Sequence, residues 1–155
     1  MSVDTSQYVE RLKGTARDLV SLITGADAGA LTRRPAPREW SAATTVAHMA
    51  DAELVFAVRL RLVVAEERPL LSAFDENAWS ERFGALDPDP RDSLQRWRAV
   101  RENTVRLLES LAPAEWERTG MHQERGVMTV AAIAKLLTDH DKGHLDQIRT
   151  ALATR

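Results

Sequence analysis

Three of the four histidines in this chain are placed where they could bind one metal ion. His140 and His144 stand four residues apart in a segment of helical pattern, so both imidazoles would project from one helix face, about one turn apart. His48 lies far upstream in a second segment of helical pattern. Three protein ligands leave a coordination position for water or substrate, which is typical of catalytic rather than structural sites. The sequence therefore predicts a divalent-metal centre held by His48, His140 and His144.

The identity of the ion is open, because neutral imidazole binds several first-row metals; zinc, nickel and iron are the ions we expect. The segment lacks the glutamate of the H-E-x-x-H motif, so the zinc-protease interpretation is excluded. A histidine on an apolar helix face is more often a packed residue than a ligand. A helical bundle without a metal is therefore an alternative that spacing alone leaves open.

Carboxylates stand near these histidines. Asp51 is three residues after His48, and Asp141 is three residues before His144. Either carboxylate could accept the ring N–H that faces away from the metal. Asp51 could instead point into the cavity as a base, and it is the residue that we predict to be catalytic. Glu53 is a weaker choice because it lies off the face that carries His48.

The remaining histidine and the tryptophans have simpler interpretations. His122 lies in the loop before the last helical segment and is interpreted as a surface residue, with the alternative that it lines the mouth of a pocket. Trp79, in an aromatic segment, could form a wall of a substrate pocket. Large apolar side chains commonly anchor small cores, so Trp40, Trp97 and Trp116 are expected to be core residues.

Composition excludes several classes of function. The 155 residues suit one domain covering 1–155. With 21 basic and 23 acidic residues the net charge is −2, which offers no general attraction to nucleic acid or to an anionic membrane. Cysteine is absent, so the chain can supply neither a disulfide, a thiol nucleophile nor a thiolate ligand. Without a signal-peptide pattern or an apolar run of about 20 residues, a cytoplasmic protein is expected.

Four segments place apolar residues three and four positions apart, which predicts long amphipathic helices. They cover about residues 5–23, 41–67, 89–112 and 129–152. Ser41, Asp89 and Thr129 are the expected N-caps of the last three. A short helix or irregular segment is expected over 74–83, and a short ribbon over 121–127. Four such helices predict an all-α four-helix bundle, and the long connections allow a topology other than simple up-and-down.

These motifs together resemble a known family. Trp40 and Ser41 followed by His48 and Glu53 are similar to the opening of the second helix in the DinB-like superfamily, W-S-x-x-x-x-x-x-H-x-x-x-x-E. Residues 140–148 resemble its closing motif, H-D-x-x-H-x-x-Q-I. The acidic-aromatic segment 74–79 and the residues 126–129 before the last helix are also similar. The resemblance spans nearly the whole chain in the same order and spacing.

The resemblance implies a bundle of the DinB-like type, with a divalent metal on His48, His140 and His144, and with frequent homodimers. It also implies an activity, since characterised relatives include metal-dependent transferases and isomerases that use low-molecular-weight thiols such as bacillithiol or mycothiol. The leading hypothesis is therefore an S-transferase, in which the metal activates the thiol co-substrate to attack a small-molecule electrophile. The absence of cysteine suits this reaction, because no internal thiol would compete.

Two other functions stay open at this point. The protein could be a metal-dependent hydrolase that uses a metal-bound water, with Asp51 or another carboxylate as the base. It could also be a non-catalytic protein that binds a metal or a small ligand in a stress response.

Overall fold

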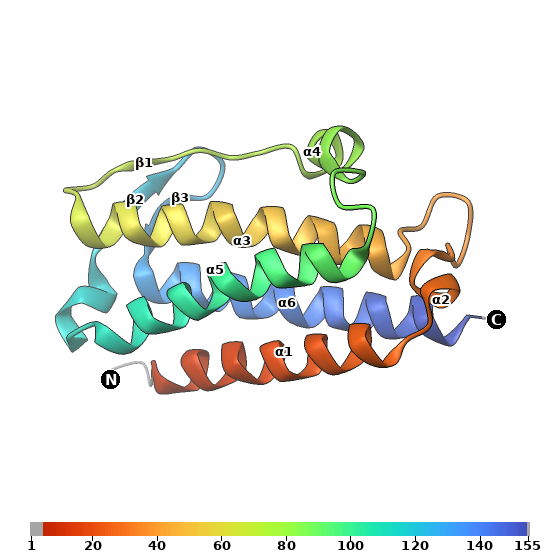
Figure 1. Cartoon of the computed structure of the whole chain (residues 1–155). Coiled ribbons are helices and arrows are strands. Elements are labelled where there is room, and N and C mark those ends of the chain that lie inside the picture. The colour runs from red at the N-terminus through yellow and green to blue at the C-terminus, as the bar shows by residue number, and fades with distance from the viewer. Residues whose placement is uncertain (1–4, 155) are drawn as a thin grey trace.

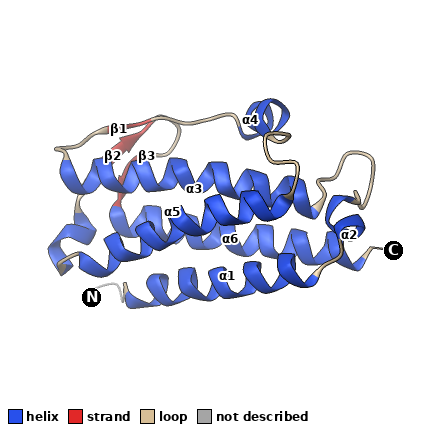
Figure 2. Cartoon of the chain, viewed as in Figure 1, coloured by secondary structure: helices blue, strands red, loops and turns tan. Residues whose placement is uncertain are grey.

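The computed structural model describes residues 5–154 and is mostly helical, with a small three-stranded sheet at one end (Figures 1 and 2). The four long helices are α1 (Ser6–Gly25), α3 (Ala42–Ala65), α5 (Pro90–Ser110) and α6 (Val130–Ala153). The shorter elements are α2 (Ala28–Thr32), β1 (Leu70–Leu71), α4 (Glu76–Phe83), the 3₁₀-helix η1 (Pro113–Glu117), β2 (Thr119–His122) and β3 (Gly126–Thr129). Within residues 5–154, no helix combines the length and apolar character needed to cross a membrane.

The predicted helix starts are confirmed. The backbone N–H of Thr44 donates to the side chain of Ser41 at 3.1 Å, which satisfies one of the unpaired donors at the start of α3. Asp89 and Thr129 accept backbone N–H groups in the same way before α5 and α6. Pro90 is the first residue of α5, where its missing N–H removes no helical bond.

The four long helices form a bundle that is not simply up-and-down. In Figure 1, α1 and α6 run in one direction, and α3 and α5 run in the opposite direction. Each of α1 and α3 packs against both α5 and α6. The consecutive helices α3 and α5 are therefore parallel neighbours, joined by a long connection that carries β1 and α4 back along the outside of the bundle (Figure 1). The long connections expected from the sequence do produce a crossover.

A small sheet closes one end of the bundle. Strands β2 and β3 form the predicted ribbon as an antiparallel hairpin, in which Met121 pairs with Val127. Strand β1 adds to β2 in parallel, with Leu70 opposite Met121. The hairpin rests closely on α3 because residue 120 is glycine: a Cβ on Gly120 would lie 2.9 Å from Cγ2 of Val63. The predicted four-helix bundle with a short ribbon is confirmed. The sheet gains a third strand from β1, whose two residues are too few to show a sequence pattern.

Two apolar clusters fill the bundle, and a layer of charged residues separates them. One cluster is centred on residues such as Leu12, Leu60 and Ile133, and the other on residues such as Leu19 and Trp97. Between them along α3, α5 and α6 lie Glu53, Arg101 and Asp141, each 1% exposed. Charged residues are almost never buried this deeply unless they are paired.

Arg101 connects all four long helices through this layer. On α5, its Nε and Nη2 donate to the carboxylate of Glu53 on α3 at 2.9 and 2.6 Å. Its Nη1 donates to Asp141 on α6 at 2.7 Å and to the carbonyl oxygen of Leu12 on α1 at 3.4 Å. The guanidinium also lies 4.5 Å from the ring centroid of Trp97. These contacts fix how far each helix is shifted relative to its neighbours.

The charges of this layer stabilise one another. Burial alone would lower the pKa of Arg101, but the carboxylates of Asp141 and Glu53 outweigh burial and raise it. Burial alone would raise the pKa of Asp141, but Arg101 outweighs it and holds that pKa below its ordinary value. Arg101 and Asp141 are therefore charged at neutral pH. With two carboxylates against one guanidinium, the layer has one excess negative formal charge.

Replacing Arg101 by methionine should destabilise the fold severely, because two buried carboxylates would lose the one arginine or lysine that pairs with them within residues 5–154. Removing one partner of a buried ion pair costs about 3–5 kcal/mol, and we expect a loss of that size in the free energy of unfolding measured in urea. The matched control is Arg106→Met, an exposed arginine of the same helix, which should change stability by roughly 0.5 kcal/mol or less. Equal urea midpoints for the two variants would contradict the role given to Arg101.

Candidate metal centre

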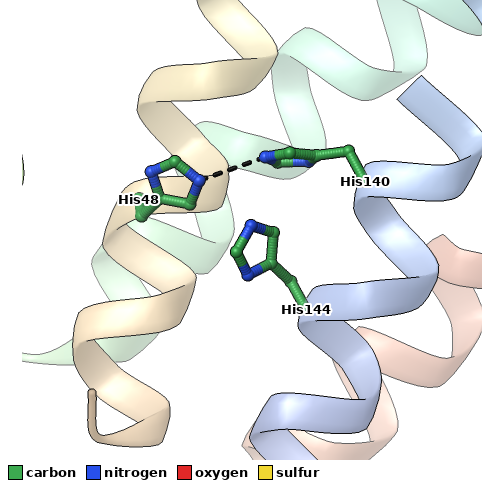
Figure 3. A group of neighbouring side chains, drawn as sticks. All are labelled: His48, His140 and His144. Carbon is green, nitrogen blue, oxygen red and sulfur yellow. Dashed lines mark hydrogen bonds between the residues drawn. The ribbon is translucent and has the colours of Figure 1, made fainter. Parts of the chain in front are cut away.

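The three predicted metal ligands converge between two antiparallel helices. His48 comes from the second turn of α3, and His140 and His144 come from successive turns of α6 (Figure 3). The Nε2 atoms of His48 and His140 are 3.1 Å apart, and one nitrogen of each histidine lies within 4.8 Å of the others. Two nitrogens bound to one zinc ion at about 2.1 Å lie roughly 3.4 Å apart in tetrahedral geometry. The structure thus brings the ligand atoms together at a spacing that suits one ion.

The imidazoles of His48 and His144 are held in the neutral form that binds metal. His48 is 3% exposed. Burial, with smaller contributions from the neighbouring His144 and His140, lowers the pKa of His48 to about 3. Burial and His140 also lower the pKa of His144. Neutral imidazole offers the lone pair that a metal ion needs, so the protonation state of these two rings fits a divalent cation.

Gln147 orients one of the ligands. Nδ1 of His144 lies 2.9 Å from Oε1 of Gln147, one turn further along α6. Because an amide oxygen only accepts, Nδ1 carries the proton and Nε2 presents its lone pair. Asp141, which the spacing had suggested for this role, points into the bundle and pairs with Arg101 instead. The signal for Gln147 was present in the closing motif, where it follows His144 by three residues.

His140 is oriented by charge. Its Nδ1 is buried and has no hydrogen-bond partner among residues 5–154. The Oδ1 atom of Asp141 lies 4.0 Å away, which is too far for a hydrogen bond and close enough for electrostatic attraction. A proton on Nδ1 is favoured there, which leaves the lone pair on the Nε2 atom that faces His48. The excess negative charge of the buried layer therefore lies next to the proposed cation.

Asp51 lies in a different network. Its carboxylate is 3.6 Å from Arg96, which also binds Asp87 at 2.6 Å. Within residues 5–154, no hydrogen bond joins Asp51 to His48. Burial raises the pKa of Asp51 above its ordinary value although Arg96 opposes it. The expected role of Asp51 as a base stays a prediction.

Trp40 covers one side of the three histidines. Its ring centroid lies 5.0 Å from that of His48 and 6.4 Å from that of His144, and it is nearly parallel to the latter ring. The expectation that Trp40 anchors the core is therefore wrong, because the turn before α3 places it beside the histidines. Trp97 and Trp116 are buried core residues, as expected.

A small cavity of about 110 Å³ adjoins the histidines, and His140 is part of its wall. His122 also lines this cavity and is only 4% exposed, so its interpretation as a surface residue is wrong and the pocket alternative holds. The β2–β3 hairpin turns His122 inward, which the sequence pattern did not show. Trp79 is not part of this wall and packs instead against Phe74 and Phe83, with centroids 4.9 and 5.7 Å away.

Fold and site together define a four-helix-bundle protein with a three-histidine site between α3 and α6. The sequence profile of the DinB superfamily matches residues 11–148. The chain therefore belongs to the DinB superfamily.

Relatives in this family carry descriptions of metal-dependent chemistry. OB0782 from Oceanobacillus iheyensis is 31% identical over 116 residues, which cover 75% of this chain and 66% of that protein. BH0277 from Halalkalibacterium halodurans is 24% identical over 149 residues, which cover 96% of this chain and 86% of that protein. Their names assign both provisionally to the metal-dependent hydrolases.

The same architecture is present in a solved structure. YfiT from Bacillus subtilis, described as a probable metal-dependent hydrolase with an unusual four-helix bundle topology, superimposes with a TM-score of 0.86 at 22% identity. The match covers 95% of this chain and 85% of YfiT. At this identity the likeness establishes the fold.

Replacing His140 by alanine should abolish stoichiometric metal binding, because two imidazoles remain where three are needed. Elemental analysis of protein purified without added metal should find roughly one first-row ion per wild-type chain and almost none in the variant. His122→Ala is the control, since it removes a buried histidine outside the ligand set. Retention of the metal by His140→Ala would exclude the proposed centre.

Gln147→Ala should weaken the site without destroying it. Loss of a group that orients a ligand typically lowers metal affinity about 10- to 100-fold, and competition against a chromophoric chelator would measure that change. Gln147→Glu keeps an oxygen acceptor for Nδ1 of His144 and should retain most of the affinity. An unchanged affinity in Gln147→Ala would show that this hydrogen bond does not orient the ligand.

Proposed function

We propose that this protein is a metal-dependent hydrolase that cleaves small amides or esters. The observation that carries the proposal is the convergence of three imidazoles from α3 and α6. The names of the bacterial relatives and of YfiT support the same class of reaction.

The number of protein ligands favours catalysis over a structural role. Within the part of the chain that is described, the group holds three residues and no fourth histidine, cysteine, aspartate or glutamate. Structural zinc sites almost always use four protein ligands, whereas catalytic sites use three. A site with three histidines therefore leaves room for water or substrate.

The residues around the site have separable roles in such a reaction. A divalent ion in this position supplies a Lewis acid and lowers the pKa of water. His48, His140 and His144 would hold the ion, while Gln147 fixes the ring of His144. Trp40 shields one side of the ligands from bulk water, which strengthens electrostatic interactions at the centre.

Thiol transfer is the second function that we propose, because the chain contains no cysteine. A low-molecular-weight thiol could therefore take the remaining coordination position without competition from the protein itself. The three histidines would hold the ion that lowers the pKa of this thiol. The thiolate sulfur would then bond to a carbon of an electrophile in the adjoining cavity, with release of chloride from a chlorinated arene or opening of the ring C–O bond of an epoxide.

The two reactions can be separated with one set of assays. Metal-loaded protein should release product from small amides or esters without any thiol, and chelation should reduce the rate at least about 100-fold because the Lewis acid is lost. The competing reaction is tested with a bacillithiol- or mycothiol-type thiol and an epoxide or chlorinated arene, with the conjugate detected by mass spectrometry. Conjugate formation without hydrolysis would replace the first proposal by the second.

Two variants control these assays. His140→Ala should remove either activity together with the metal. Asp51→Asn should keep the metal and lower hydrolysis about tenfold or more if Asp51 accepts a proton in the reaction. Absence of turnover in both assays, with the metal bound, would favour the non-catalytic binding protein.

A further inference from the structure

The cavity beside His140 contains a buried cation that the proposed chemistry does not use. Arg59 lines this cavity together with His140 and is 7% exposed. It follows His48 by eleven residues on α3, which places it on nearly the same helix face, about 16 Å further along the axis. Phe56 links the two sites, since its ring centroid is 5.7 Å from the His140 ring and 5.7 Å from the Arg59 guanidinium.

The hydrogen-bonding capacity of Arg59 is largely unused. Its Nη2 donates to the carbonyl oxygen of Ser72, while its buried Nε has no hydrogen-bond partner among the described residues. No carboxylate among residues 5–154 forms an ion pair with it. This contrasts with Arg101, whose buried charge is matched by two carboxylates. Burial and the neighbouring Arg125 lower the pKa of Arg59, although the carboxylates of Glu124 and Glu76 attract it without forming ion pairs. A buried cation that forms no ion pair is unfavourable, and a bound anion would reduce that penalty.

A second donor lines the same cavity. The backbone N–H of Glu124 donates to Nδ1 of His122 at 3.2 Å, so the neutral ring carries its proton on Nε2. Burial, followed by the charges of Arg59 and Arg125, lowers the pKa of His122 and keeps the ring neutral. His122 can therefore donate one hydrogen bond to an acceptor beside Arg59.

The other charged groups of the cavity lie at its exposed side. Glu76, Glu124 and Arg125 line it and are exposed to solvent. Neither glutamate forms an ion pair with Arg59 or Arg125 within the described residues. Solvent and salt screen these three charges, whereas the charge of Arg59 is screened far less because that residue is buried. The net attraction for an anion is therefore strongest at Arg59.

We propose that Arg59 binds the carboxylate of the substrate, so that the enzyme acts on short amides or esters that carry a free carboxylate. This inference rests on the proposed function, which places the bond that is cleaved at the three histidines. A planar guanidinium matches a carboxylate in geometry and charge. The cavity of about 110 Å³ holds only a small group, since one water occupies about 30 Å³ of liquid.

The test is a comparison of two probes that differ in one charge. Isothermal titration of the metal-loaded protein with N-acetylglycine and with the neutral N-acetylglycinamide should show about tenfold or more tighter binding of the acid, because charged hydrogen bonds are the strong ones. Arg59→Gln should remove this preference and Arg59→Lys should keep part of it. Arg61→Gln, an exposed arginine of the same helix, should leave it unchanged.

Several outcomes would overturn the inference. One is equal binding of the two probes by the wild type. Another is a preference for N-acetylglycine that survives in Arg59→Gln, which would place the carboxylate on the metal instead. If inorganic phosphate binds as tightly as N-acetylglycine, the site does not select for a carboxylate. If Arg59→Gln does not fold, the two probes are compared on the metal-free wild type. A preference for N-acetylglycine in that protein cannot come from a metal ion.

Failure of the proposed function gives a different result. Arg59-dependent binding of N-acetylglycine without any hydrolysis would preserve the anion site and reject the hydrolase. Hydrolysis of charged and neutral amides with the same KM, unchanged in Arg59→Gln, would preserve the hydrolase and reject the anion site.

Discussion

The ion pairs of one buried guanidinium set the geometry on which the rest of this structure depends. Arg101 binds side chains on α3 and α6 and a backbone carbonyl on α1. Its partner Glu53 follows His48 by five residues, and its partner Asp141 is adjacent to His140. Because this charged layer fixes the position of α3 along α6, it also fixes how the histidines of the two helices face each other. Buried charges tolerate little displacement, so the metal ligands are held by a rigid support.

The same layer makes the site suitable for a cation. Two carboxylates and one guanidinium leave one excess negative charge in the interior, while burial keeps His48 and His144 neutral by lowering their pKa values. Neutral ligands beside a fixed negative charge favour a positive ion in surroundings of low dielectric constant. Positive charge on the imidazoles themselves is disfavoured because the three rings lie so close together.

The candidate metal ligands come only from two long helices, whereas the cavity beside them is also lined by connecting segments. These are the segment after β1 and the β2–β3 turn. Connections of this kind can vary without disturbing a helical scaffold. A family with this architecture can therefore keep one metal centre and act on different substrates, which is why the fold alone does not identify the reaction.

The sequence by itself determined the four long helices, the N-caps of three of them and the three histidines, because these features depend on local spacing and on short motifs. It did not determine the partners of charged side chains. Glu53 and Arg101 are 48 positions apart, and nothing in their local patterns indicates that they meet. Nor did it show that His122 turns inward or that Gln147, rather than Asp141, orients His144. Only the tertiary structure decided these points, because the packing of distant helices determines which polar groups must satisfy one another in the interior.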